Sequence, residues 1–112
     1  MGGSDEGPNP IEYQLAALAG CLNVTAHQVA RERDIELSNF AVDVEGDFDP
    51  AVFMGKTDEG RAGLRNVRAS VDIEADAGPD ELRGLFEAVE RRCPISDTLQ
   101  DQSALELNVV KR

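Results

Sequence analysis

The sequence predicts an α+β domain in which one long helix packs against an antiparallel sheet. Three observations carry this prediction. Residues 9–33 have the apolar spacing of a long helix, residues 67–75 alternate strictly between apolar and polar side chains, and residues 79–92 return to helical spacing. The 112 residues suffice for one compact domain, which we expect to span 1–112 with a flexible N-terminus at 1–8. The expected order of elements is α-β-β-α-α-β.

The first helix is expected from Asn9 to about Arg33. Asn9 is a favourable N-cap, Pro10 suits the first helical position, and the Glu12 carboxylate can accept a hydrogen bond from the backbone N–H of the cap. Apolar residues at helical spacing predict one buried face, formed by Leu15, Leu18, Leu22, Ala26 and Val29.

Two strands are expected after this helix. The first covers about 35–47, and a change of apolar phase within it predicts a β-bulge near Ser38–Asn39. The second covers 67–75 and has one solvated face. In the long connection between them, Phe53 and Met54 are candidates to line an apolar entrance for a substrate; the alternative is that they anchor the loop to the core.

The remaining chain predicts a helix over 79–92, a short helix that starts after Cys93, and a final strand marked by apolar residues at 105, 107 and 109. Three strands cannot easily cover the apolar surface of the first helix. This helix also carries the small residues Ala16 and Gly20, which would let another backbone approach closely. This imbalance predicts a partner subunit, most simply in a twofold dimer.

Composition excludes several classes of function. The formal net charge is −11, from 22 acidic and 11 basic residues, so the surface repels nucleic-acid phosphates. An acidic, lysine-poor surface suits a salt-rich cytoplasm and favours a halophilic source, although an ordinary acidic protein is the alternative. No apolar run is long enough to span a membrane and no secretory signal is visible, so we expect a cytoplasmic protein. The single histidine, His27, is expected at the surface or in an interface, and no metal site is expected.

The two cysteines raise the question of reactivity. Cys93 directly precedes Pro94 and is expected to cap the short helix, where backbone N–H groups and the positive potential of Arg91 and Arg92 favour the thiolate. By this local argument Cys93 has the lower pKa, unless it only caps the helix. Cys21, inside the long helix, is by itself most simply an inert thiol. Its side of the helix is mixed, however, because it also carries Gln14, Thr25 and Gln28.

The segments "GPNPIEYQLAALAGC" and "RCPISDTL" together resemble the osmotically inducible protein C (OsmC) family, which includes the organic hydroperoxide resistance proteins. Cys21 follows Pro10 by eleven residues, and Cys93 opens a C-P-x-S motif. The resemblance implies an intertwined homodimer that reduces organic hydroperoxides without a metal or bound organic cofactor. It also implies that Cys21 is the peroxidatic thiol and that Cys93 resolves its sulfenic acid to a disulfide, which an external dithiol reduces.

In the peroxidases of that family, an arginine held by a glutamate stabilises the attacking thiolate. Glu12 corresponds loosely to the glutamate, but the arginine comes from strands that precede the helix. Those strands have no counterpart here, and the first arginine is Arg31. Either Arg61, Arg65 or Arg68 replaces it, or the activity is weak, altered or absent.

The spacing of Glu12 and Cys21 limits how the two can cooperate. Nine residues of ideal helix place them half a turn out of phase and about 13.5 Å apart along the axis. If Glu12 serves a Cys21 site, it comes from the other subunit; otherwise it only completes the helix cap.

Three alternatives to a peroxidase remain at this point. The chain could form a non-catalytic dimer that binds a small molecule in an apolar pocket. It could act as a redox sensor whose disulfide changes a partner interaction. The third alternative is a shortened chain that takes its missing strands from a separate polypeptide.

Overall fold

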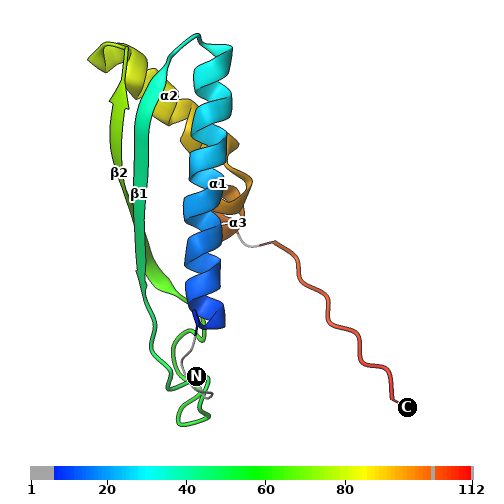
Figure 1. The fold of residues 1–112 in the computed structure, drawn as a ribbon. Coiled ribbons are helices and arrows are strands. Elements are labelled where there is room, and N and C mark those ends of the chain that lie inside the picture. Colours follow the sequence, from blue (N-terminus) through cyan, green and yellow to red (C-terminus); the bar gives the residue numbers. More distant parts are fainter. Residues whose placement is uncertain (1–6, 102, 112) are drawn as a thin grey trace.

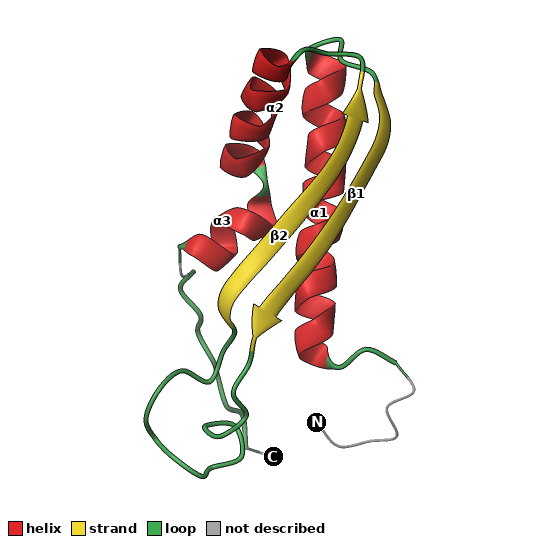
Figure 2. Cartoon of the chain, turned by 90° about the vertical axis from the view of Figure 1, so that its left-hand side faces the viewer, coloured by secondary structure: helices red, strands yellow, loops and turns green. Residues whose placement is uncertain are grey.

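The computed structural model describes residues 7–101 and 103–111, and its helices and strands form two layers. Five elements follow one another: α1 (Pro10–Glu32), β1 (Leu37–Asp47), β2 (Arg65–Ala75), α2 (Pro79–Arg92) and α3 (Pro94–Gln100). The strands form an antiparallel hairpin that lies along α1, and α2 and α3 lie beside α1 (Figure 1, Figure 2). The α+β prediction is confirmed for these elements. Most of the segment expected to be flexible, 1–8, lies outside the described residues.

The start of α1 is the predicted capping motif. The Asn9 side-chain oxygen accepts a hydrogen bond from the Glu12 N–H at 2.9 Å, and the Glu12 carboxylate accepts one from the Asn9 N–H at 3.0 Å. These two bonds satisfy N–H groups that a helix leaves without an intrahelical partner. α1 is long enough to contact β1, α2 and α3, and it is therefore the central element of the fold.

The hairpin has the predicted bulge, because its register shifts between Leu37 and Asn39. β1 starts later than expected, at Leu37. The N–H of Ile35 donates to the Ala30 carbonyl at 2.8 Å, so Ile35 closes the end of α1 and does not pair with β2. Asp34 makes this reversal with a φ of 55°. Ile35 nevertheless remains buried, as its apolar side chain requires.

The hydrophobic core lies between α1, α2 and the inner face of the hairpin. α1 contributes Leu18, Leu22, Ala26, Val29 and Ala30, and α2 contributes Leu85, Ala88 and Val89. Side chains from the inner face of the hairpin pack against this cluster and are partly exposed. The predicted apolar face of α1 is thus buried except for Leu15, which is half-buried near its first turns.

The final strand expected at 105–109 is not formed. Residues 103–111 run away from the rest of the chain without strand pairing (Figure 1, orange to red). Leu107 and Val109 are 82% and 94% exposed. A strand needs the backbone groups of a neighbouring edge, and alternating side chains alone do not supply them. The sheet consequently has two strands, and this segment keeps its apolar side chains in solvent.

No helix in the part of the chain that the structure describes is both long and apolar enough to cross a membrane.

Candidate functional site

The two cysteines, 72 positions apart in the sequence, meet where α1 contacts α3. Cys21 lies near the middle of α1 and is partly exposed. Cys93 is both the C-cap of α2 and the N-cap of α3, and its exposed fraction is 0%. Both are free thiols, and they are close enough for each to influence the pKa of the other. The fold therefore places an accessible thiol directly beside a buried one.

Hydrogen bonds favour the thiolate of Cys21. Burial raises the pKa of its thiol, but the backbone N–H of Ile95, the Cys93 thiol and the Thr25 hydroxyl all donate to the charged sulfur and lower it. The net effect is a pKa below the ordinary value for cysteine. The Thr25 oxygen lies 4.0 Å from the Cys21 sulfur, one turn further along α1.

Cys93 behaves in the opposite way. Burial raises the pKa of its thiol, and the N–H of Ser96 offsets this only in part, because the neighbouring Cys21 raises the pKa further. The prediction that Cys93 has the lower pKa is therefore wrong. Its place before α3 is as expected, but its complete burial outweighs the local effect of the helix start.

Two of the arginines that could have stabilised a thiolate, Arg68 and Arg92, have other partners. Arg92 makes a two-pronged ion pair with Glu32, with both nitrogen–oxygen distances at 2.8 Å. Arg68 pairs with Glu45 and Asp47 on the hairpin. Among the described residues, no cation contributes to the pKa shift of either cysteine. Neutral donors therefore supply the stabilisation that the sequence assigned to an arginine.

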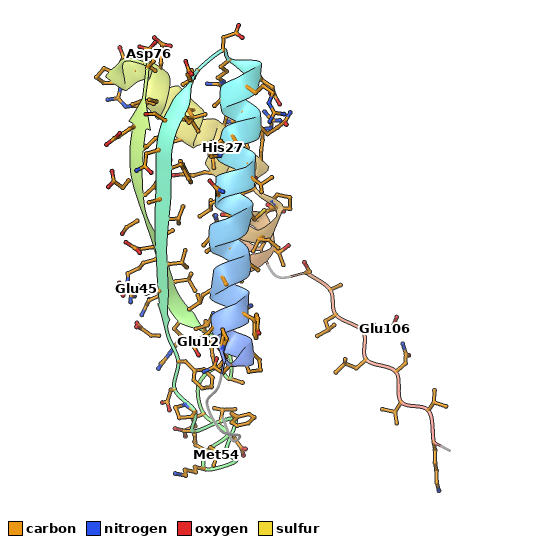
Figure 3. The ribbon with its side chains drawn as sticks, viewed as in Figure 1. Glu12, His27, Glu45, Met54, Asp76 and Glu106 are labelled. Carbon is orange, nitrogen blue, oxygen red and sulfur yellow. The ribbon has the colours of Figure 1, made fainter. Side chains whose placement is uncertain are left out.

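The other predicted site residues lie elsewhere. The Glu12 carboxylate is occupied in the cap of α1, nine residues before Cys21. Phe53 and Met54 are exposed in the connection between the strands, and Met54 lies beyond Glu12 at the N-terminal end of α1 (Figure 3). Within one chain, these three residues do not meet Cys21. His27 is exposed, and its Nδ1–H donates to the Asn23 carbonyl at 2.9 Å.

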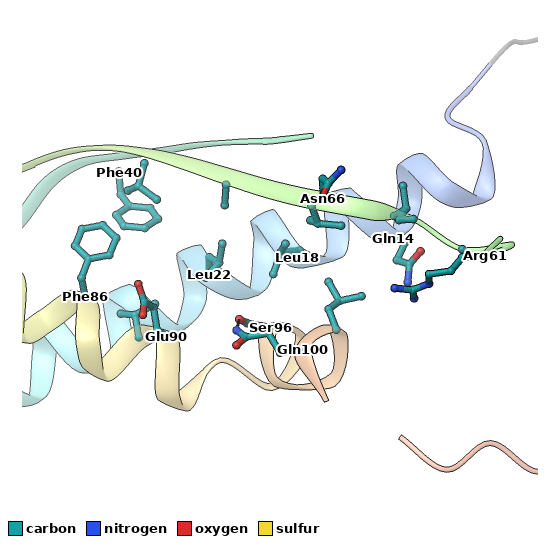
Figure 4. A pocket seen from close by; sticks show the side chains of 17 residues that line it. Gln14, Leu18, Leu22, Phe40, Arg61, Asn66, Phe86, Glu90, Ser96 and Gln100 are labelled. Carbon is teal, nitrogen blue, oxygen red and sulfur yellow. Dashed lines mark hydrogen bonds between the residues drawn. The ribbon is translucent and has the colours of Figure 1, made fainter. Parts of the chain in front are cut away.

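A groove of about 610 Å³ opens beside β2, between the hairpin and the three helices (Figure 4). Leu18, Leu22, Phe40 and Phe86 give it an apolar interior, and Arg61 lies near one end. Neither cysteine lines it. No local pattern in the sequence indicates this groove, because its lining comes from all five helices and strands.

Among the donors to Cys21, Ile95 was not recognised from the sequence. Its role depends on how α3 packs against α1, and no local pattern reports that packing. Thr25 was placed on the correct side of the helix by its spacing of four from Cys21, which brings two side chains together on a helix surface. That spacing was the one available signal for the hydrogen bond.

Fold and site define a two-thiol protein built around a long central helix. The chain belongs to the OsmC-like protein family, whose sequence profile matches residues 3–108. The resemblance drawn from the two cysteine motifs is thereby confirmed.

Two similar proteins are called hydroperoxide reductases. The one from Mycoplasma genitalium is 27% identical over 104 residues, and the one from Mycoplasma pneumoniae is 30% identical over 104 residues. In both cases the match covers 93% of this chain and 70% of the relative.

Solved structures show the same fold. An OsmC-like protein from Mycoplasma pneumoniae superposes with a TM-score of 0.75 at 26% identity, over 87% of this chain. This chain spans 65% of that protein's length. An OsmC-like hydroperoxide resistance protein from Jannaschia superposes with a TM-score of 0.69 at 16% identity, over 97% of this chain and 72% of its own.

Proposed function

We propose that this protein is a thiol-dependent peroxidase that reduces organic hydroperoxides. The observation that carries the proposal is the pairing of Cys21, partly exposed and with a lowered pKa, with the buried thiol of Cys93. A thiolate is the nucleophile in such chemistry, and a second thiol within reach can resolve the product. The names of the two Mycoplasma relatives support the same substrate class.

The proposed reaction has three steps. The Cys21 thiolate attacks one peroxide oxygen, the O–O bond breaks, and the alkoxide takes a proton to leave as an alcohol. Cys21 is then a sulfenic acid. Cys93, after losing its proton, attacks the Cys21 sulfur, and the sulfenic oxygen leaves as water while the disulfide forms. An external dithiol supplies two electrons and two protons to restore both thiols.

A homodimer is part of this proposal. α1 exposes an apolar stripe that includes Tyr13, Gly20 and Val24, and Val24 is 68% exposed. Cys21 lies between this stripe and the buried face of the helix. A second copy seated on the stripe would shelter the thiol from water, and the exposed apolar residues at 105–110 offer it further surface.

The dimer would also give the remaining predicted residues a role. Glu12, Phe53 and Met54 cannot reach Cys21 of their own chain, so we propose that they approach the Cys21 of the other subunit. Glu12 would orient the site, while Phe53 and Met54 would contact the alkyl part of the hydroperoxide.

The test of the peroxidase proposal is loss of cumene hydroperoxide in the presence of dithiothreitol. Cys21→Ser should abolish turnover. In a separate experiment without dithiothreitol, Cys93→Ser should permit one oxidation of Cys21, detected as a dimedone adduct of the sulfenic acid, without disulfide formation. A Cys21→Ser variant that consumes peroxide at the rate of the unchanged protein would overturn the proposal. Sedimentation equilibrium tests the dimer, which Val24→Asp should dissociate.

A second candidate is a binding function for the groove beside β2. The groove is large enough for a small apolar molecule and excludes both cysteines, so occupation would not require thiol chemistry. Native mass spectrometry of the purified protein would then show a retained small ligand. Retention that survives Cys21→Ser but not Phe86→Arg, in a protein that does not consume peroxide, would favour this function over the peroxidase.

A further inference from the structure

Thr25 is the one buried polar side chain in the described part of the chain, with an exposed fraction of 9%. It lies on α1 one turn after Cys21, and its hydroxyl oxygen is 4.0 Å from the Cys21 sulfur. Buried hydroxyl groups need a hydrogen-bond partner, and the partner of this one among the described residues is the sulfur. The pair therefore joins a buried hydroxyl group to a partly exposed sulfur.

The direction of this hydrogen bond depends on the charge of the sulfur. A neutral Cys21 thiol can donate to Thr25 or accept from it. A thiolate has no proton, so the Thr25 hydroxyl must donate. A donor that bonds the charged form favours that form, and a buried donor does so with little competition from solvent.

Thr25 differs from the other two donors to the Cys21 sulfur. The Cys93 thiol is itself a reactant in the proposed cycle, because it must lose its proton to attack the sulfenic acid. The Ile95 donor is a backbone N–H, which depends on the packing of α3. Thr25 does not react, and the helix holds it at a fixed spacing from Cys21 before any substrate arrives.

We propose that the Thr25 hydroxyl donates a hydrogen bond to the Cys21 sulfur and maintains the thiolate that attacks the hydroperoxide, an inference that rests on the proposed function. Thr25 thereby supplies, as a neutral donor on the same helix, part of the stabilisation for which no described residue offers a positive charge. Valine has nearly the shape of threonine but no hydroxyl group, so Thr25→Val isolates the effect of the hydrogen bond.

The experiment measures the pH dependence of Cys21 alkylation by iodoacetamide. It uses a Cys93→Ser background so that Cys21 is the one thiol that reacts. Thr25→Val should move the midpoint of this dependence upward by about one pH unit, which lowers the rate about tenfold at pH values well below the midpoint. Thr25→Ser should restore the parent midpoint. Thr98→Val, which removes an exposed hydroxyl on α3, is the matched control and should leave the midpoint unchanged.

The shape of the profile separates this role from a structural one. If Thr25 only packs, Thr25→Val leaves the midpoint in place and changes the thermal unfolding temperature alone; that result overturns the inference. If the valine variant does not fold, Thr25→Ala provides the same test. Alkylation does not require peroxidase activity. A shifted midpoint in a protein that fails to consume cumene hydroperoxide would therefore refute the proposed function and leave the hydrogen bond established.

Discussion

Oxidation of the two thiols should make the fold substantially more stable, and the size of the effect follows from their positions. A Cys21–Cys93 disulfide joins residues 72 positions apart. Closing a loop of this length removes conformational entropy from the unfolded chain, equivalent to about 4 kcal/mol at 25 °C. Because the two cysteines are neighbours in the fold, we expect forming the bond to require little rearrangement that would offset this gain.

Guanidinium denaturation of the reduced and oxidised protein measures this difference. The oxidised form is prepared with one equivalent of cumene hydroperoxide, and intact mass under non-reducing conditions establishes that the bond lies within one chain. For a domain of this size, a gain of 4 kcal/mol corresponds to a rise of roughly 1–2 M in the denaturation midpoint. Cys93→Ser cannot form the bond, so the same treatment should leave its midpoint close to that of its reduced form.

Two results would refute the reasoning. An oxidised protein that carries the internal disulfide but unfolds at the same guanidinium concentration as the reduced form would mean that joining the sulfurs distorts the fold. A bond that links two chains would mean that the nearest partner of Cys21 is not the Cys93 of its own chain.

Three further predictions concern stability. Leu85→Ala should lower the free energy of unfolding by about 2–5 kcal/mol because Leu85 is buried between α2 and α1, whereas Glu87→Ala on the exposed side of α2 should change it by less than about 0.5 kcal/mol; equal effects in denaturation would contradict the described core. Asn9→Ala should cost about 1 kcal/mol through loss of the cap of α1, measured in the same way, and no loss would mean that the cap is dispensable. Glu32 has a pKa of about 2, lowered from 4.5 first by its hydrogen bonds with Arg92. The stabilisation from this pair should therefore be complete above about pH 4.5 and disappear as the pH falls through about 2, so the difference in melting temperature between the unchanged protein and Glu32→Gln should shrink over that range. A difference that stays constant from pH 7 to pH 2 would rule out the ion pair as its source.

The helices and strands were predictable because their signals are local. The cap of α1 depends on Asn9 and Glu12, three positions apart, and the bulge in β1 depends on a change of apolar phase within one strand. The two cysteine motifs were equally local, and they led to the family that the comparison establishes. The prediction of a final strand was wrong because a strand needs the edge of a neighbouring strand with which to pair. Alternation at 105–109 shows only that the side chains are compatible with a strand.

The sequence alone determined the order of the first five elements, most of the buried face of α1 and the presence of two thiols in motifs typical of one family. It determined these because periodicity, capping and motif spacing are properties of neighbouring residues. The tertiary structure alone decided the directions of the two pKa shifts. Packing of α3 against α1 buries Cys93 and brings neutral donors to Cys21, while Arg92, adjacent to Cys93 in the chain, is bound to Glu32 instead. A pKa reflects every group around the sulfur, and most of those groups are distant in sequence.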